Sequence, residues 1–161
     1  MERLSKPNYY LDIAQTVAER GTCLRRKFGA IIVKNDSIVS TGYAGAPRGR
    51  KNCCDIGECM REKLGIPRGE RYELCRSVHA EANAIIAASR ETMIGADLYL
   101  ACISPKTHEL VGGTCCCQMC KRLVINAGIA RVYVRETADK YTVYNVSDWI
   151  ENDDSLGQIG Y

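Results

Sequence analysis

Residues 77–86 read SVHAEANAII, an apolar helical pattern that contains a histidine and a glutamate two positions apart. We predict a buried helix from about 78 to 90 around this stretch. Positions i and i+2 lie on different faces of a helix, so His79 and Glu81 cannot pair along its surface. Only within the first turn can both side chains face one site. Whether such a site exists depends on the partners that the rest of the chain supplies.

The segments around this helix predict an α/β fold with a mixed sheet. β-branched residues on either side of the turn KNDS predict an antiparallel hairpin, and strand, helix and strand alternate in the second half of the chain. Such alternation favours parallel strands with right-handed crossovers. The predicted order is helix, strand, strand, helix, strand, helix and strand, over residues 9–21, 30–33, 38–42, 78–90, 97–103, 117–127 and 131–135.

Length and composition predict one domain over residues 1–161, with 46% hydrophobic and 25% charged residues. The hydrophobic residues of 44–69 recur with neither a helical nor a strand period, so we predict an irregular loop there. The acidic end of the chain, from about residue 147, predicts a short helix or a mobile tail. No apolar run approaches the roughly 20 residues that span a bilayer, and the N-terminus has no signal core. We therefore expect a cytoplasmic protein with no membrane partner.

Charge is distributed unevenly along the chain. The formal net charge of +3 is too small to indicate a nucleic-acid partner. Between residues 20 and 76, however, there are 13 Lys or Arg and 6 Asp or Glu. A small anionic ligand would suit this half of the chain, and a solvated basic face explains most of these residues equally well.

The partners for His79 come from the stretch GTCCCQMCKRL at residues 113–123. Cys117 and Cys120 have the spacing of two thiolate ligands at the start of a helix, whose N-terminus also favours the thiolate form. With His79 they make three ligands, which leaves the fourth position of a tetrahedral zinc open to water. Glu81 is then the predicted proton acceptor. A CxxC pair alone could instead be redox-active or half of a structural zinc site, and a lone histidine is usually a core or surface residue.

An H-x-E motif combined with C-x-x-C is the signature of zinc-dependent nucleobase deaminases. The blocks TCLRRKFGAIIVKND, STGYAGAP, ELCRSVHAEANAI and CQMCKRLVINAGIARV resemble deoxycytidylate (dCMP) deaminases of the cytidine deaminase-like superfamily, and the resemblance covers residues 9–135. It implies a three-layer α/β/α sandwich with a mixed sheet of about five strands. It also implies the hydrolysis of dCMP to dUMP with release of ammonia, a step of pyrimidine deoxynucleotide metabolism.

The resemblance gives each site residue a role. His79, Cys117 and Cys120 would hold a catalytic Zn²⁺ that activates water. Glu81 would take a proton from that water, protonate N3 of the pyrimidine and pass a proton to the departing amine. Ala80 would orient the ring through its backbone. Members of the family form oligomers and can be controlled by dCTP and dTTP, so we expect a homo-oligomer and regard both nucleotides as candidate effectors.

The resemblance also implies a second, structural Zn²⁺ that would order the irregular loop. Cys54 is an alternative to Cys53 in this set, and four reduced core cysteines are the competing interpretation. The four implied ligands are Cys23, Cys53, Cys59 and Cys75.

The phosphate of a nucleotide substrate requires a cationic partner. Arg25 or Arg26, beside the first strand, could bind it through a planar bidentate fork. Arg48 and Arg50 in the irregular loop are alternatives. For each of these arginines, the alternative that its side chain only faces solvent has equal weight.

Two positions depart from the family pattern. Cys116 replaces a proline before the CxxC, which removes pre-organisation of the helix start and no ligand. Ala44 replaces an asparagine that contacts the sugar, so the choice between deoxyribose and ribose stays open. The connection over residues 104–115 is also longer than expected, and it could form a small hairpin.

Two other functions use the same residues. The first is a deaminase of cytidine, CMP or a tRNA base, although the mild charge and the single Trp and single Phe disfavour a nucleic-acid groove. The second is a non-catalytic, zinc-stabilised nucleotide-binding protein, which would have no use for an uncoordinated carboxylate at Glu81. Replacement of Glu81 distinguishes an enzyme from such a binding protein.

Overall fold

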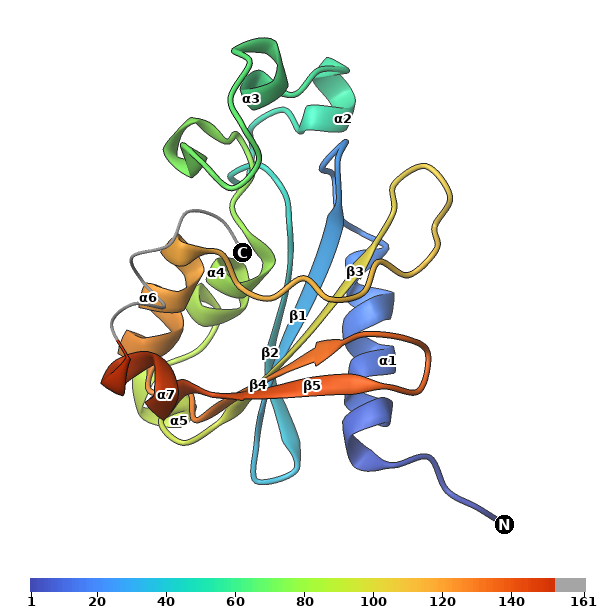
Figure 1. The fold of residues 1–161 in the computed structure, drawn as a ribbon, viewed down its shortest axis with the longest axis vertical. Coiled ribbons are helices and arrows are strands. Elements are labelled where there is room, and N and C mark those ends of the chain that lie inside the picture. Colours follow the sequence, from blue (N-terminus) through green and yellow to red (C-terminus); the bar gives the residue numbers. More distant parts are fainter. Residues whose placement is uncertain (153–161) are drawn as a thin grey trace.

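Five strands form one mixed sheet through the centre of the molecule (Figure 1). The computed structural model describes residues 1–152. The strand order is β2-β1-β3-β4-β5; β3 and β4 run parallel, and the other neighbours are antiparallel. The strands are β1 (Lys27–Lys34), β2 (Ser37–Tyr43), β3 (Asp97–Ile103), β4 (Arg131–Arg135) and β5 (Tyr141–Asn145).

Helices cover both faces of the sheet and complete three layers. The first helix, α1, packs on one face, where Leu11 and Ala14 share a buried cluster with Ile31 and Tyr99. Four later helices pack on the opposite face around a larger cluster (Figure 1). The predicted three-layer sandwich is confirmed. The helices of these two layers are α1 (Lys6–Ala18), α4 (Ala80–Ile86), α5 (Arg90–Met93), α6 (Gln118–Ala127) and α7 (Val146–Glu151).

A cysteine segment, which we define as residues 51–78, lies beyond one end of the sheet (Figure 1). It contains three short helical turns: α2 (Cys53–Ile56), α3 (Met60–Lys63) and η1 (Tyr72–Leu74). The segment leads directly into α4, whose N-terminal end it faces. The predicted irregular loop is therefore a group of turns placed next to the helix that the sequence singled out.

Two glycines let helices approach the sheet closely. A Cβ at Gly29 would lie 2.1 Å from the carbonyl oxygen of Ala14 in α1. On the other face, a Cβ at Gly42 would lie 2.4 Å from the carbonyl oxygen of Ala80 and 2.4 Å from the amide nitrogen of Ala84, both in α4. Neither position has room for a side chain, so these glycines set the depth at which α1 and α4 sit on the sheet.

Most predicted elements are present with small changes. The hairpin turns through Asn35 and Asp36, whose φ angles of 50° and 60° are those of a two-residue turn matched to the strand twist. The strands at 97–103 and 131–135 have their predicted bounds and pair in parallel. The single helix predicted over 78–90 is wrong, because α4 ends at Ile86 and the Ser89 hydroxyl accepts a hydrogen bond from the Thr92 amide to start α5.

The end of the chain contains β5, a strand that the periodicity did not predict, and a short helix, α7. β5 pairs antiparallel with β4 and extends the sheet, and α7 follows it directly. α7 matches the short helix that was one of two alternatives for the acidic end; the mobile tail, for residues 153–161, lies outside the described residues. Within residues 1–152, no helix has the length and apolar character needed to cross a bilayer.

The long connection after β3 folds back on itself. The Ser104 amide donates to the Glu109 carbonyl oxygen, and the Val111 amide donates to the Cys102 carbonyl oxygen. A bridge between Ile103 and Leu110 completes this small hairpin-like excursion. The connection then runs across the end of the sheet to the start of α6 (Figure 1).

Candidate active site

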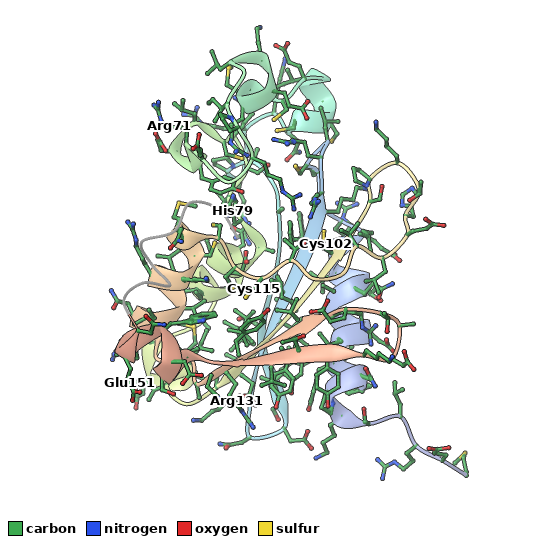
Figure 2. All side chains as sticks on the ribbon, viewed as in Figure 1. Arg71, His79, Cys102, Cys115, Arg131 and Glu151 are labelled. Carbon is green, nitrogen blue, oxygen red and sulfur yellow. The ribbon has the colours of Figure 1, made fainter. Side chains whose placement is uncertain are left out.

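Three ligand atoms converge where the N-terminal ends of α4 and α6 meet. His79 is the N-cap residue of α4 and Cys117 is the N-cap residue of α6, so Cys120 lies in the first turn of that helix. Nδ1 of His79 lies 3.4 Å from Sγ of Cys117 and 3.4 Å from Sγ of Cys120. All three ligand atoms lie within 4.8 Å of one another. In Figure 2, His79 lies at the end of α4 that faces the cysteine segment.

The chemistry of this donor set fits zinc. Two thiols and one imidazole nitrogen are borderline-soft ligands, and three protein ligands leave one position of a tetrahedral ion open, as in catalytic zinc sites. Cys117 and Cys120 are both buried, so solvent does not compete for their sulfurs. Among the residues that the structure describes, this is the one group of three such ligand atoms that are close enough to hold a metal ion.

Hydrogen bonds within the group shift the pKa values of its members. A hydrogen bond from Cys120 lowers the pKa of Cys117, against the effect of burial, and His79 adds to this shift. Burial lowers the pKa of His79, but hydrogen bonds with Cys117 and Cys75 outweigh it and raise the pKa. Binding of a metal ion by these residues would be coupled to proton release.

Glu81 is buried beside this group, with 4% of its surface exposed. Burial raises the pKa of its carboxyl above the usual value, and the positive charge of His79 opposes the shift. A carboxyl with a raised pKa can both accept and return a proton near neutral pH, which suits a general acid and base. Cys116, also fully buried, shares a hydrogen bond with Glu81. The start of α4 thus brings His79 and Glu81 to one place.

A small cavity of about 80 Å³ that opens to solvent is lined by His79, Ala80 and Glu81. Ala44 lines the cavity, as does Phe28 from β1. The opposite wall comes from the cysteine segment and from the turn before β1, and it carries four arginines: Arg25, Arg26, Arg61 and Arg68.

The arginines predicted from the sequence occupy different positions. Arg25 lines the cavity and forms an ion pair with Glu62 at 3.0 Å. Arg26 also lines it, and its Nη1 donates to the Thr114 hydroxyl at 2.9 Å. Arg48 is exposed and does not line the cavity.

Arg61 and Arg68 line the cavity as well, and the sequence did not single them out. The sequence MREK around Arg61 is typical of a solvent-exposed helical turn. No feature of the local sequence distinguishes Arg61 from the other basic residues in this half of the chain. A buried cation in the cysteine segment becomes visible only once the segment is folded against α4.

The four cysteines implied as a second metal site interact electrostatically, but within residues 1–152 no three of their sulfurs lie close enough together to hold a metal ion. Cys53 is buried, and burial raises the pKa of its thiol, with further small contributions from the other three. Cys54 is exposed, so Cys53 is the better candidate of the pair. Three members of the set line the cavity itself: Cys23, Cys59 and Cys75.

Comparison with known proteins places these observations in a family. Residues 4–136 match the cytidine and deoxycytidylate deaminase zinc-binding region. The chain belongs to this deaminase family. The matched range includes His79, Glu81, Cys117 and Cys120.

Named relatives and a solved structure support this assignment. The deoxycytidylate deaminase of Mycobacterium phage D29 is 38% identical over 143 residues, which cover 85% of this chain and 100% of the relative. The deoxycytidylate deaminase of Schizosaccharomyces pombe is 32% identical over 81% of this chain, which spans only 37% of that longer protein. The crystal structure of the dCMP deaminase from cyanophage S-TIM5 in complex with dCMP and dUMP has a TM-score of 0.60 and 27% identity, over 98% of this chain and 96% of that one.

The fold extends to more distant deaminases. Cytidine deaminase from Burkholderia pseudomallei superposes with a TM-score of 0.57 at 17% identity, over 87% of this chain and 92% of that chain. At this identity the likeness concerns the fold alone. The mixed five-stranded sheet with helices on both faces is therefore the architecture of the cytidine deaminase-like group.

Proposed function

We propose that this protein is a zinc-dependent dCMP deaminase, which converts dCMP and water to dUMP and ammonia. The observation that carries the proposal is the placement of Glu81 beside the His79, Cys117 and Cys120 group at the floor of an arginine-lined cavity. The relatives named deoxycytidylate deaminase, and the S-TIM5 enzyme that binds dCMP and dUMP, support the choice of substrate.

The zinc ion would be held by Nδ1 of His79 and by the sulfurs of Cys117 and Cys120. When bound, it supplies the Lewis acidity that makes a water molecule a nucleophile near neutral pH. The two thiolates and the neutral imidazole leave this centre formally uncharged. A protein base is consequently needed to complete the activation of water.

Glu81 is the proposed proton carrier. Its carboxylate accepts the proton of the attacking water and delivers it to N3 of the cytosine, which makes C4 a better electrophile. After attack at C4, the remaining proton of the former water moves through the same carboxyl to the departing amine. The product carries a carbonyl at C4, and ammonia leaves with the C–N bonding pair. Burial of Glu81 keeps this proton away from bulk solvent between steps.

The substrate would enter with its ring over the first turn of α4. Ala80 lines the cavity between the ligand and the proton carrier, so its backbone is placed to orient the pyrimidine. Arg25 and Arg26 line the same cavity and support recognition of an anionic substrate. Ala44 presents only a methyl group toward the space for the sugar, so selection of deoxyribose falls to other groups.

The deciding experiment follows ammonia release from dCMP, CMP, deoxycytidine and cytidine by the zinc-loaded protein, with and without dCTP. A strong preference for dCMP is the expected result. Reaction with the nucleosides alone would retain the chemistry and reject the nucleotide substrate. Absence of turnover under all conditions would reject the enzyme assignment.

A structural zinc in the cysteine segment is a separate part of the proposal. Burial of Cys53 and exposure of Cys54 favour Cys53 over Cys54 in the set Cys23, Cys53, Cys59 and Cys75, whose sulfurs would have to draw together to bind the ion. The expected stoichiometry is two zinc ions per chain, falling to one in Cys53→Ser and staying at two in the matched control Cys54→Ser. One zinc per chain in a fully active wild-type preparation would reject the second site.

The remaining parts concern the whole protein. We propose one deaminase domain over residues 1–161, a homo-oligomer, a cytoplasmic location and control by dCTP and dTTP. Light scattering of the zinc-loaded protein measures the subunit number. Titration of dCTP and dTTP into the dCMP assay tests the control, and a sigmoidal response to dCMP that dCTP removes is the expected signature.

A further inference from the structure

Arg61 carries a charge that the surrounding protein does not neutralise. It lies in α3 of the cysteine segment with 5% of its surface exposed. Its Nε donates to the carbonyl oxygen of Glu70 and its Nη2 to the carbonyl oxygen of Pro67, both at 3.0 Å. Both acceptors are neutral, and within residues 1–152 no carboxylate lies within ion-pair distance of this guanidinium.

The other arginines of the cavity wall differ from Arg61 in this respect. Arg25 is paired with the carboxylate of Glu62, and both side chains are partly exposed. Arg26 is hydrogen-bonded to Thr114 and is also only partly buried. A buried cation without an anionic partner is costly, because desolvation is compensated only when a counter-charge lies close by. The fold therefore holds Arg61 in a place where an anion would be strongly favoured.

Arg61 lies on the wall of the cavity that contains the reactive group. Its guanidinium stacks over the ring of Tyr72, 4.2 Å from the centroid. The ring of Tyr72 meets the ring of His79 edge-on, with centroids 4.9 Å apart and an angle of 84° between the planes. Arg61, Tyr72 and His79 therefore form a continuous chain of side-chain contacts, which fixes the position of the guanidinium relative to His79.

The donor inventory of Arg61 matches a phosphate group. A guanidinium has five N–H donors, and two of these are used by the carbonyl oxygens of Glu70 and Pro67. The remaining donors are held in a rigid plane that suits bidentate recognition of phosphate oxygens. Arg68 lines the same wall and adds positive potential.

We propose that Arg61 binds the 5′-phosphate of the substrate and makes the enzyme select nucleotides over nucleosides. This inference rests on the proposed function and assigns its specificity to the cysteine segment. Arg25 and Arg26 then add to the positive electrostatic potential of the cavity, and Arg61 supplies the buried contact with the phosphate. The segment ends just before His79 and includes no residue of the catalytic group, and it becomes the part of the protein that contacts the phosphate.

The test compares Arg61→Gln and Arg61→Lys with the matched control Arg71→Gln, an exposed arginine of the same segment. For Arg61→Gln, kcat/KM for dCMP should fall about 10- to 100-fold, as expected when a charge-assisted contact is lost. The value for deoxycytidine should change by less than about threefold. In Arg61→Lys, kcat/KM for dCMP should fall less than in Arg61→Gln, because lysine keeps the positive charge but lacks the planar pair of N–H donors. Arg71→Gln should match the wild type on both substrates.

Equal losses on dCMP and deoxycytidine would overturn the proposal and make Arg61 a positioning residue that acts on His79 through Tyr72. Unchanged kinetics on both substrates would also overturn it. If Arg61→Gln does not fold, as judged by its zinc content and thermal melt, Arg61→Lys decides on the same criterion.

Binding of dUMP and deoxyuridine to the zinc-loaded protein keeps this test separate from the proposed function. Calorimetry should show a Kd for dUMP about 10- to 100-fold weaker in Arg61→Gln and an unchanged Kd for deoxyuridine. A wild-type protein without dCMP turnover would contradict the proposed function, while this measurement would still test the phosphate contact. An equal Kd for dUMP in the wild type and the variant would overturn the role of Arg61.

Discussion

Replacement of Gly42 by alanine should damage the reaction far more than replacement of Gly29, although both changes crowd a helix against the sheet. The new Cβ at Gly42 would lie 2.4 Å from backbone atoms of Ala80 and Ala84 in α4. Ordinary contact requires about 3.5 Å, so α4 must move outward by roughly 1 Å. Overpacking of this kind costs about 1–3 kcal/mol of folding free energy. A 1 Å displacement of reacting groups costs about 100-fold in rate.

Gly29→Ala is the matched control because its Cβ would lie 2.1 Å from the backbone of α1, on the other face of the sheet. Urea unfolding should show a similar loss of stability for both variants. Ammonia release from dCMP by the folded, zinc-loaded proteins should fall about 100-fold for Gly42→Ala and only slightly for Gly29→Ala. Equal losses of kcat/KM in the two variants, or full stability of Gly42→Ala, would refute the reasoning that the depth of α4 positions His79 and Glu81.

Three further outcomes are expected. Glu81→Gln should keep its zinc and lose about 100- to 10,000-fold in kcat, since only the proton carrier is removed; a loss of zinc in this variant would assign the carboxylate to the metal instead. Hydrogen bonds from Lys6 and Tyr10 lower the pKa of Asp36, so its stabilising contribution is present above the usual Asp pKa and is lost as the pH falls through the lowered value. Asp36→Asn should therefore be less stable than the wild type at pH 7 in thermal melts, with the difference fading only as the pH falls below the usual Asp pKa of about 3.9, and a difference that grows in acid would contradict this. Trp149→Ala should cost about 3–5 kcal/mol in urea unfolding, because this α7 residue is buried in the larger core cluster, whereas a cost near zero would mean that α7 is not part of the domain core.

The sequence predicted the elements whose signal is local and missed those that depend on a neighbour. The strands at 97–103 and 131–135 are almost entirely buried, so each reads as an apolar run. β5, at Tyr141–Asn145, is a half-exposed edge strand that acquires its identity by pairing with β4. The break between α4 and α5 lies in an apolar pattern with no glycine or proline, and it is made by the Ser89 cap.

The same contrast separates the proposed catalytic group, which has a local sequence signal, from the proposed phosphate contact, which depends on the fold. His79 with Glu81, and Cys117 with Cys120, are each short motifs at the start of a helix, and a three-ligand zinc site joins them without knowledge of the fold. The environment of Arg61 depends on carbonyl oxygens six and nine residues away and on the ring of Tyr72. Charge counting found the basic half of the chain but could not show which arginine the fold would bury.

The position of the cysteine segment beyond the end of the sheet has an evolutionary consequence. The proposed catalytic residues lie at the starts of α4 and α6, which are anchored in the core, whereas the proposed contact with the phosphate belongs to a segment that contributes no strand to the sheet. Insertions, deletions or exchanges in that segment can alter which pyrimidine derivative is accepted while the proton-transfer machinery stays in place. A library of chimaeras with residues 51–74 taken from other deaminases would explore new substrates on an unchanged catalytic frame.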